Sequence, residues 1–197
     1  ILLQVRSDNP PALSLYRRRG FVTYDVVHEL GLPPQDWPIA IGDNSTSLRH
    51  VRDRDARSLY AVVMASVPHA TLIRRPIYAE RFRRGLAWQL GQYWQMAMGG
   101  PQRYELVGEV LGKIVAYGGV TTRLLSGPYD LELYVLPEHR GVWELPLASQ
   151  LIEVVAGLPH HRLQAHLSAS HPEAFDALRK LGFQTQRVLD QMSLDLV

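Results

Sequence analysis

The sequence predicts an α+β fold, with a central mixed sheet flanked by helices. Stretches with the alternation of strands are separated by stretches with helical spacing, and three strand-like stretches follow one another near the middle of the chain. Residues 130–151, DLELYVLPEHRGVWELPLASQL, give the second observation: a buried strand is stopped by proline and leads through a basic, glycine-containing loop into a helix. With 197 residues, 46% of them hydrophobic, the chain can bury a core.

Each element follows from a local pattern. Residues 1–5 are an apolar strand, Asn9 caps a helix that Gly20 ends, and residues 21–30 are rich in valine and tyrosine, as strands are. Residues 33–46 contain prolines and no periodicity, which is typical of a linker. Beyond it we expect a strand at 47–51, helices at 53–67 and 76–84, the latter extending toward 98, strands at 104–110, 114–125 and 129–136, a helix at 146–156, a strand at 162–167, a helix at 171–181 and one or two strands within 183–197.

Composition excludes several classes of protein. The chain has no cysteine, so disulfides, thiolate metal sites and cysteine nucleophiles are excluded, and we expect a cytoplasmic protein. The histidines lack the spacing of metal ligands, and no apolar run reaches the ~18 residues of a membrane span. The net charge is only +2, and the short arginine clusters are typical of solvated helix faces. We therefore expect no metal, no membrane contact and no nucleic-acid partner.

Two stretches of the chain repeat one another. Residues 9–21, NPPALSLYRRRGF, align without a gap with residues 171–183, HPEAFDALRKLGF. Each copy follows a strand that contains Leu-Gln and precedes another strand, so the repeated unit is strand, helix, strand. A duplicated unit of this size indicates two copies of a larger domain. The chain begins in strand character without a methionine, and we expect it to be a piece of a longer polypeptide.

Three places in the chain resemble the GCN5-related N-acetyltransferase (GNAT) family. LRHVRDRD at 48–55 is similar to the family's opening strand and first helix, and VLPEHRG at 135–141 is similar to its acyl-CoA loop. The two helix-Gly-Phe segments are similar to its last helix and following strand. The resemblance implies a complete GNAT-like domain at 47–197, a linker at 33–46, and at 1–32 the C-terminal strand–helix–strand of a first, truncated domain.

The resemblance also implies an activity, the transfer of an acetyl group from acetyl-CoA to a small-molecule or peptide amine. In such a domain acetyl-CoA lies between two splayed strands, and an amine needs a general base and a general acid. The implied general base is Glu132, and the implied acid is Tyr16, one turn before Gly20; a solvated carboxylate is the alternative for Glu132. The residues implied in cofactor binding are Leu133, Tyr134 and Val135 for the pantetheine, Arg140, Gly141 and Val142 for the pyrophosphate, and Asn9 on the first copy.

The complete copy departs from the family pattern at its loop. Small residues are expected after Gly141, because they let backbone N–H groups approach a phosphate. Trp143 and Leu145 stand there instead, Glu144 adds a negative charge, and Pro146 removes a donor. We expect Trp143 to fill the space between the splayed strands.

The last helix of the complete copy departs as well. Where the first copy has Asn9 and Tyr16, the second has His171 and Leu178, and we expect His171 to be a capping or surface residue. Two hypotheses remain: an acetyltransferase whose complete copy is degenerate, or a non-catalytic GNAT-like binding or scaffolding domain that supports a catalytic first domain. Either a homodimer or packing against the missing first domain would cover the strand–helix–strand at 1–32.

Overall fold

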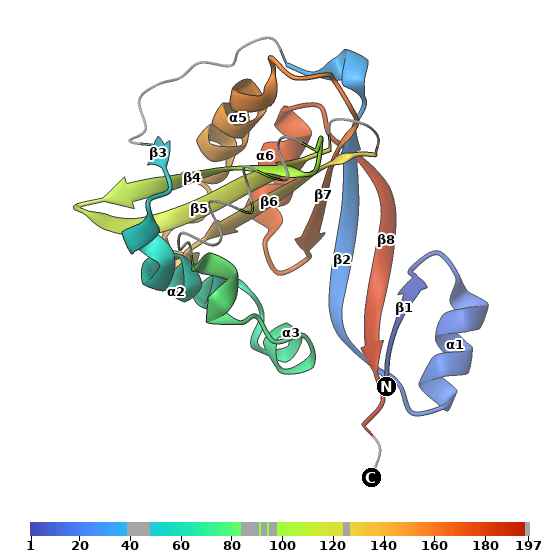
Figure 1. Ribbon diagram of the computed structural model, residues 1–197. Helices are drawn as coiled ribbons and strands as arrows, with labels where there is room; N and C mark the ends of the chain where they lie inside the picture. The colour runs from blue at the N-terminus through green and yellow to red at the C-terminus, as the bar shows by residue number, and fades with distance from the viewer. Residues whose placement is uncertain (39–47, 84–90, 92–93, 95–97, 124–126, 196–197) are drawn as a thin grey trace.

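The structure, a computed structural model, describes residues 1–38, 48–83, 91, 94, 98–123 and 127–195. Eight strands form one mixed sheet in the order β1-β8-β2-β7-β6-β5-β4-β3 (Figure 1). This arrangement confirms the predicted α+β fold. The strands are β1 Leu2–Arg6, β2 Val22–Leu32, β3 Leu48–His50, β4 Gln102–Val110, β5 Lys113–Thr122, β6 Tyr129–Val135, β7 Leu163–Ser168 and β8 Gln184–Ser193.

Helices cover both faces of the sheet. On one face α5 and α6 pack together and α5 lies against β4, β5 and β6; on the other, α2 lies against β5 and β6 and is followed by α3 (Figure 1). The helices are α1 Pro10–Arg18, α2 Ala56–Ser66, α3 His69–Arg74, α5 Glu144–Val155 and α6 Pro172–Lys180, and the short 3-10 turns are η1 Pro34–Asp36, η2 Asp53–Asp55, η3 Ala79–Phe82 and η4 Pro137–His139.

The predicted helix at 76–84 is wrong. Residues up to Tyr78 are extended, and only Ala79–Phe82 form a 3-10 turn. A residue before proline is pushed away from helical backbone angles, which keeps Arg75 out of a helix ahead of Pro76. Phe82 is buried against α2, so tertiary packing, not helical periodicity, sets the path of this segment. The predicted extension toward residue 98 falls mostly outside the described residues.

The two copies of the repeat have the same backbone. Asn9 and His171 occupy the N-cap positions with φ, ψ of −116°, 74° and −126°, 66°. Gly20 and Gly182 follow the two helices at φ of +86° and +92°, a left-handed conformation that only glycine adopts without strain. The duplication read from the sequence is therefore also present in the conformation of the chain.

The first copy lies inside the sheet of the second. β2 lies between β7 and β8 and is antiparallel to both, while β1 pairs with the outer edge of β8. Val27 of the first copy is paired with Leu189, its own equivalent in the second copy. Because equivalent residues face each other, a local pseudo-two-fold axis passes between β2 and β8 and relates the two units.

β6 and β7 diverge along their length. These parallel strands are paired only where Tyr129, Asp130 and Leu131 face residues 163–165, although β6 continues to Val135. Along β6 every second residue from Tyr129 is buried and those between are half-buried, as the alternation in the sequence predicts. The divergence leaves room beside the end of β6.

Candidate functional site

A cavity of about 620 Å³ lies where β6 and β7 diverge. Glu132, Leu133 and Tyr134 line it from β6, and Ser168 and His171 line it from the end of β7 and the start of α6. Residues of α3 and η3 line the same cavity, and so do residues of β2. We call this space the β6–β7 cleft.

Glu132 lies in the cleft but is bound to two guanidinium groups. Its Oε2 is 2.6 Å from an Nη2 of Arg81 and 2.7 Å from an Nη2 of Arg103. Burial acts to raise the pKa of Glu132, yet the charges of Arg103 and Arg81 outweigh it and hold that pKa below its usual value. A general base works best with a pKa near the working pH, so this ion-paired carboxylate is poorly suited to accept a proton.

Two tyrosines stand beside this carboxylate. Tyr134 stacks on Tyr117 with ring centroids 5.8 Å apart, and the Tyr117 hydroxyl donates a hydrogen bond to Glu105. Burial, followed by the charge of Glu132, raises the pKa of Tyr134 to about 12. The phenol of Tyr134 therefore stays protonated at neutral pH.

The loop after β6 is closed by a carboxylate of the chain itself. Gly141, at φ +81°, donates its N–H to Oε2 of Glu144 at 2.8 Å. The other oxygen, Oε1, lies 2.8 Å from Nε2 of His171, which donates because a carboxylate only accepts. Glu144 is 1% exposed, so both of its oxygens are used inside the protein.

The guanidinium of Arg140 bridges the end of the cleft. It donates to the carbonyl of Ser170 at 2.8 Å and to the carbonyl of Ser66 at 3.0 Å. The hydroxyl oxygen of Ser66, the last residue of α2, lies 2.7 Å from the carbonyl oxygen of Val62 and 3.0 Å from that of Val135, and its one hydrogen can be donated to either. These contacts join α2, the end of β6 and the segment before α6.

Trp143 does not fill the cleft, so that prediction is wrong. Its ring is buried against β4, where a Cβ added to Gly108 would lie 2.3 Å from the ring carbon Cε3. Residues four apart share one face of a helix, and Trp143 points to the same side as the fully buried Leu147. Leu145 also packs against this core cluster.

His171 was expected at the surface or as a cap, and that expectation is wrong too. It holds the N-cap position of α6 but makes no side-chain capping bond, and its ring is buried against Glu144. The sequence contained one indication of the Glu144–His171 pair. Both residues are polar, and they stand where the GNAT family has its acyl-CoA loop and the start of its last helix. Nothing in the sequence indicated that they would meet.

The solved structures that match this fold show which family it is like. No family model and no curated protein matches the sequence. A GCN5-related N-acetyltransferase from Sphaerobacter thermophilus matches with a TM-score of 0.61 and 18% identity, over 100% of this chain and 62% of that one. A tandem GNAT protein from the clavulanic acid biosynthesis pathway matches with a TM-score of 0.59 and 14% identity, over 98% and 61%.

A third solved structure matches the larger part of the chain. It is an acetyltransferase structure from Salmonella typhimurium with its cofactor acetyl-CoA, at a TM-score of 0.54 and 19% identity, over 78% of this chain and 95% of that one. This chain has the GNAT fold. It spans about three fifths of the length of the first two structures.

One part of this site fits acetyl-CoA, the acyl donor of GNAT enzymes, and another part does not. The β6–β7 cleft offers a cavity beside the backbone of Leu133 and Tyr134. The loop does not fit a pyrophosphate, because the Gly141 N–H is already bonded to Glu144 and Arg140 is bonded to two carbonyls. Val142, also assigned to the pyrophosphate, is an exposed side chain.

Asn9 and Tyr16 lie apart from the cleft. Asn9 is the N-cap of α1 and Tyr16 lies on this helix, which packs with β1 at the far edge of the sheet (Figure 1), and neither residue lines the cavity. The Asn9 side chain caps α1 by accepting a hydrogen bond from the N–H of Ala12 at 3.2 Å. Tyr16 packs edge-on against Phe21, with their ring centroids 5.6 Å apart. The structure thus brings Glu132, Leu133 and Tyr134 together and leaves Asn9 and Tyr16 in the first copy.

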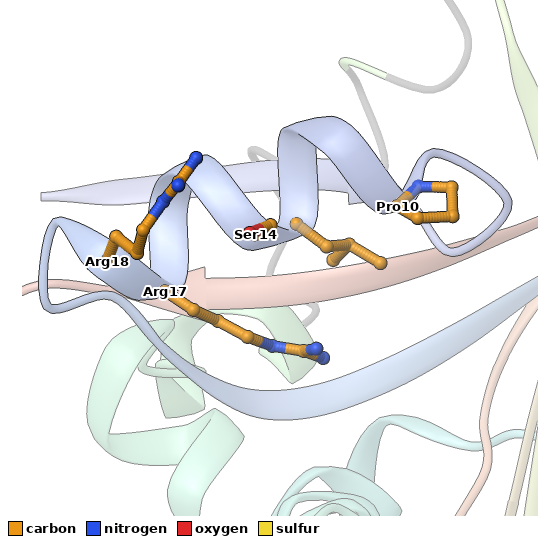
Figure 2. Close-up of a pocket in the computed structure, with 5 residues that line it drawn as sticks. Pro10, Ser14, Arg17 and Arg18 are labelled. Carbon is orange, nitrogen blue, oxygen red and sulfur yellow. The ribbon is translucent and has the colours of Figure 1, made fainter.

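The outer side of α1 has a shallow hollow of its own (Figure 2). Pro10, Ser14, Arg17 and Arg18 line it, and Arg17 extends toward β8, where an Nη2 lies 3.7 Å from Asp190. Within the described residues no three histidine, aspartate or glutamate side chains gather as a metal site would require. No helix in this part of the chain has the length and apolar character needed to span a bilayer.

Proposed function

We propose that the longer protein containing this chain is an N-acetyltransferase that uses acetyl-CoA, and that its complete GNAT-like domain at 47–197 does no chemistry. In this proposal residues 1–32 end a first GNAT-like domain, residues 33–46 link the two, and the complete domain supports the first. The fold and the tandem protein among its structural neighbours support the arrangement. The pseudo-two-fold pairing of β2 with β8 supports it independently.

One observation carries the non-catalytic role, namely that the two positions at which the family resemblance places the general base and the general acid hold no usable proton-transfer group. Acetyl transfer to an amine needs a group that accepts the amine proton and a group that protonates the leaving thiolate. Glu132 is ion-paired to Arg81 and Arg103, and the position one turn before Gly182 is Leu178, which is fully buried. The equivalent of Leu178 in the first copy is Tyr16, which can donate a proton.

The amine substrate is proposed to be a small molecule or a peptide. In the complete domain, Thr71 of α3, Arg75 directly after α3 and Arg81 of η3 line the cavity. Polar, acidic and basic side chains surround this cavity, so it suits a ligand that carries both positive and negative charge. The complete domain can therefore bind a ligand there without transferring an acetyl group to it.

The test compares acetyl transfer by this chain and by the longer protein. Release of free CoA thiol from acetyl-CoA is measured with a panel of primary amines and N-terminal peptides. We expect no release by this chain, and release by the longer protein that Tyr16→Phe lowers by roughly 10²-fold or more, as loss of a general acid does. Glu132→Gln is the matched control and should leave the rate unchanged. Turnover by this chain that depends on Glu132 would reject the proposal.

A further inference from the structure

We propose that Glu144 is an intramolecular substitute for phosphate, and that its carboxylate keeps the Gly141 N–H in the loop after β6 from binding a phosphate ligand. The ligand class excluded is the diphosphate of CoA and related nucleotides. This goes beyond the proposed function, because it names the group that closes the loop and does not depend on where acetyl transfer takes place.

The directions of the side chains single out Glu144. Trp143 is buried against β4, and Leu145 packs in the same core cluster, so neither ring nor methyl groups lie over the Gly141 N–H. Glu144 stands between them in the sequence and points toward the loop, with Oε2 at 2.8 Å from the Gly141 nitrogen. Of the residues that depart from a phosphate-binding loop, Glu144 is thus the one whose atoms occupy it.

The surroundings of the Glu144 carboxylate are those of a bound anion. It accepts from the N–H of Gly141, in the loop three residues before, and from the buried ring of His171. Glu144 is also the first residue of α5, a 12-residue helix whose N-terminus favours negative charge. Arg140 lies beside the loop, and its Nε is buried with no hydrogen-bond partner among the described residues. Hydrogen-bond donors that could hold a phosphate are therefore present around the loop. Two of them, the Gly141 N–H and the His171 ring, are bonded to the Glu144 carboxylate, and the Arg140 Nε has no partner among the described residues.

One other acidic residue faces this loop. Glu173, in the first turn of α6, lies with its Cγ 3.9 Å from the position of a Cβ built on Gly141, and its buried Oε2 has no partner among the described residues. It makes no bond to the Gly141 N–H. Removing Glu144 would leave one carboxylate near the loop, against the guanidinium of Arg140 and the ring of His171.

The experiment measures binding of CoA and of inorganic pyrophosphate by calorimetry to the wild type, Glu144→Ala and Glu138→Ala. Glu138 is an exposed residue of η4, so its removal controls for the general loss of one negative charge. We expect Glu144→Ala to bind both ligands at least about tenfold more tightly than the wild type, because a charge-assisted hydrogen bond no longer has to be displaced. Glu138→Ala should match the wild type. Equal affinity of wild type and Glu144→Ala would overturn the proposal.

Two further measurements keep the test decisive. Glu144→Gln removes the charge but still offers an oxygen to the Gly141 N–H, so it should gain little affinity; a gain equal to that of Glu144→Ala would reject occupancy as the cause. If Glu144→Ala does not fold, the wild type is examined by ¹⁵N NMR with pyrophosphate. The Gly141 amide resonance should not move, and a saturable shift would overturn the proposal. These outcomes concern binding, so they are independent of the acetyl-transfer assay.

Discussion

The helices of the two copies, α1 and α6, share a backbone and differ in what covers them. α6 packs beside α5 on one face of the sheet, next to β7, and its Leu178 is fully buried. In α1 the equivalent position is Tyr16, which is half-buried against Phe21, and the neighbouring Leu15 is exposed. The same sequence pattern therefore gives a core helix in one place and a surface helix in the other. Packing against α5 therefore decides which side chain the second copy can have at position 178. A proton-donating side chain such as tyrosine would be buried there.

The largest effect that this comparison predicts is at the paired positions 178 and 16. Leu178→Ala should lower the free energy of unfolding by about 4 kcal/mol, because a fully buried leucine leaves a cavity. Tyr16→Ala should cost clearly less, since Tyr16 is half-buried and packs on one aromatic neighbour. Urea unfolding followed by circular dichroism measures both. Equal losses would show that α1 is as well covered as α6.

A smaller difference is expected at the two N-cap positions. His171→Ala should cost about 2–3 kcal/mol, because it leaves one oxygen of the buried Glu144 carboxylate without a donor. Asn9→Ala should cost about 1 kcal/mol, the usual value of a lost helix cap at an exposed site. The same unfolding assay separates them. If Asn9→Ala proves the more costly, His171 does not stabilise the loop.

The smallest predicted effect concerns pH and Glu132, which has no ion-paired counterpart in the first copy's α1 unit. Burial acts to raise the folded-state pKa of Glu132, but the charges of Arg103 and Arg81 hold that pKa below 4.5, the value in the unfolded chain. Between these two pKa values the unfolded chain therefore binds more protons than the folded one. The contribution of Glu132 to stability is present above pH 4.5 and is lost as the pH falls through the lower folded-state value.

Thermal unfolding as a function of pH provides the check. Between pH 5 and pH 3, as an order-of-magnitude window for a carboxylate, Glu132→Gln should lose less stability than the wild type. A steeper loss in the variant would mean that the Glu132 pKa is not lowered by folding.

The sequence predicted most of the fold because its signals are local. Alternation along residues 129–135, the caps at Asn9 and Gly20 and the repeat at 171–183 each depend on near neighbours in the chain, and the structure confirms them. The helix expected at 76–84 failed because the burial of Phe82 against α2 is a long-range contact.

The site was harder to predict for the same reason. Glu132, Leu133 and Tyr134, which the family resemblance implied, line the β6–β7 cleft. The direction of Trp143 depends on how α5 is rotated against Gly108, and the bond between Glu144 and His171 joins residues 27 positions apart. Neither can be read from composition or spacing. The roles proposed for Asn9, Tyr16 and Glu132 stay predictions.

The position of β2 has a consequence for how such a protein can evolve. Among the described strands, β8 pairs with β1 and β2 and not with β7, so the last strand of the chain is held in the sheet through the first 32 residues. A recombination event that cut the gene within the 33–46 segment would leave β7 with an open edge and β8 without either of its partners. The two copies are thus inherited together: either can lose its chemistry by mutation, but neither can be deleted without exposing the sheet of the other.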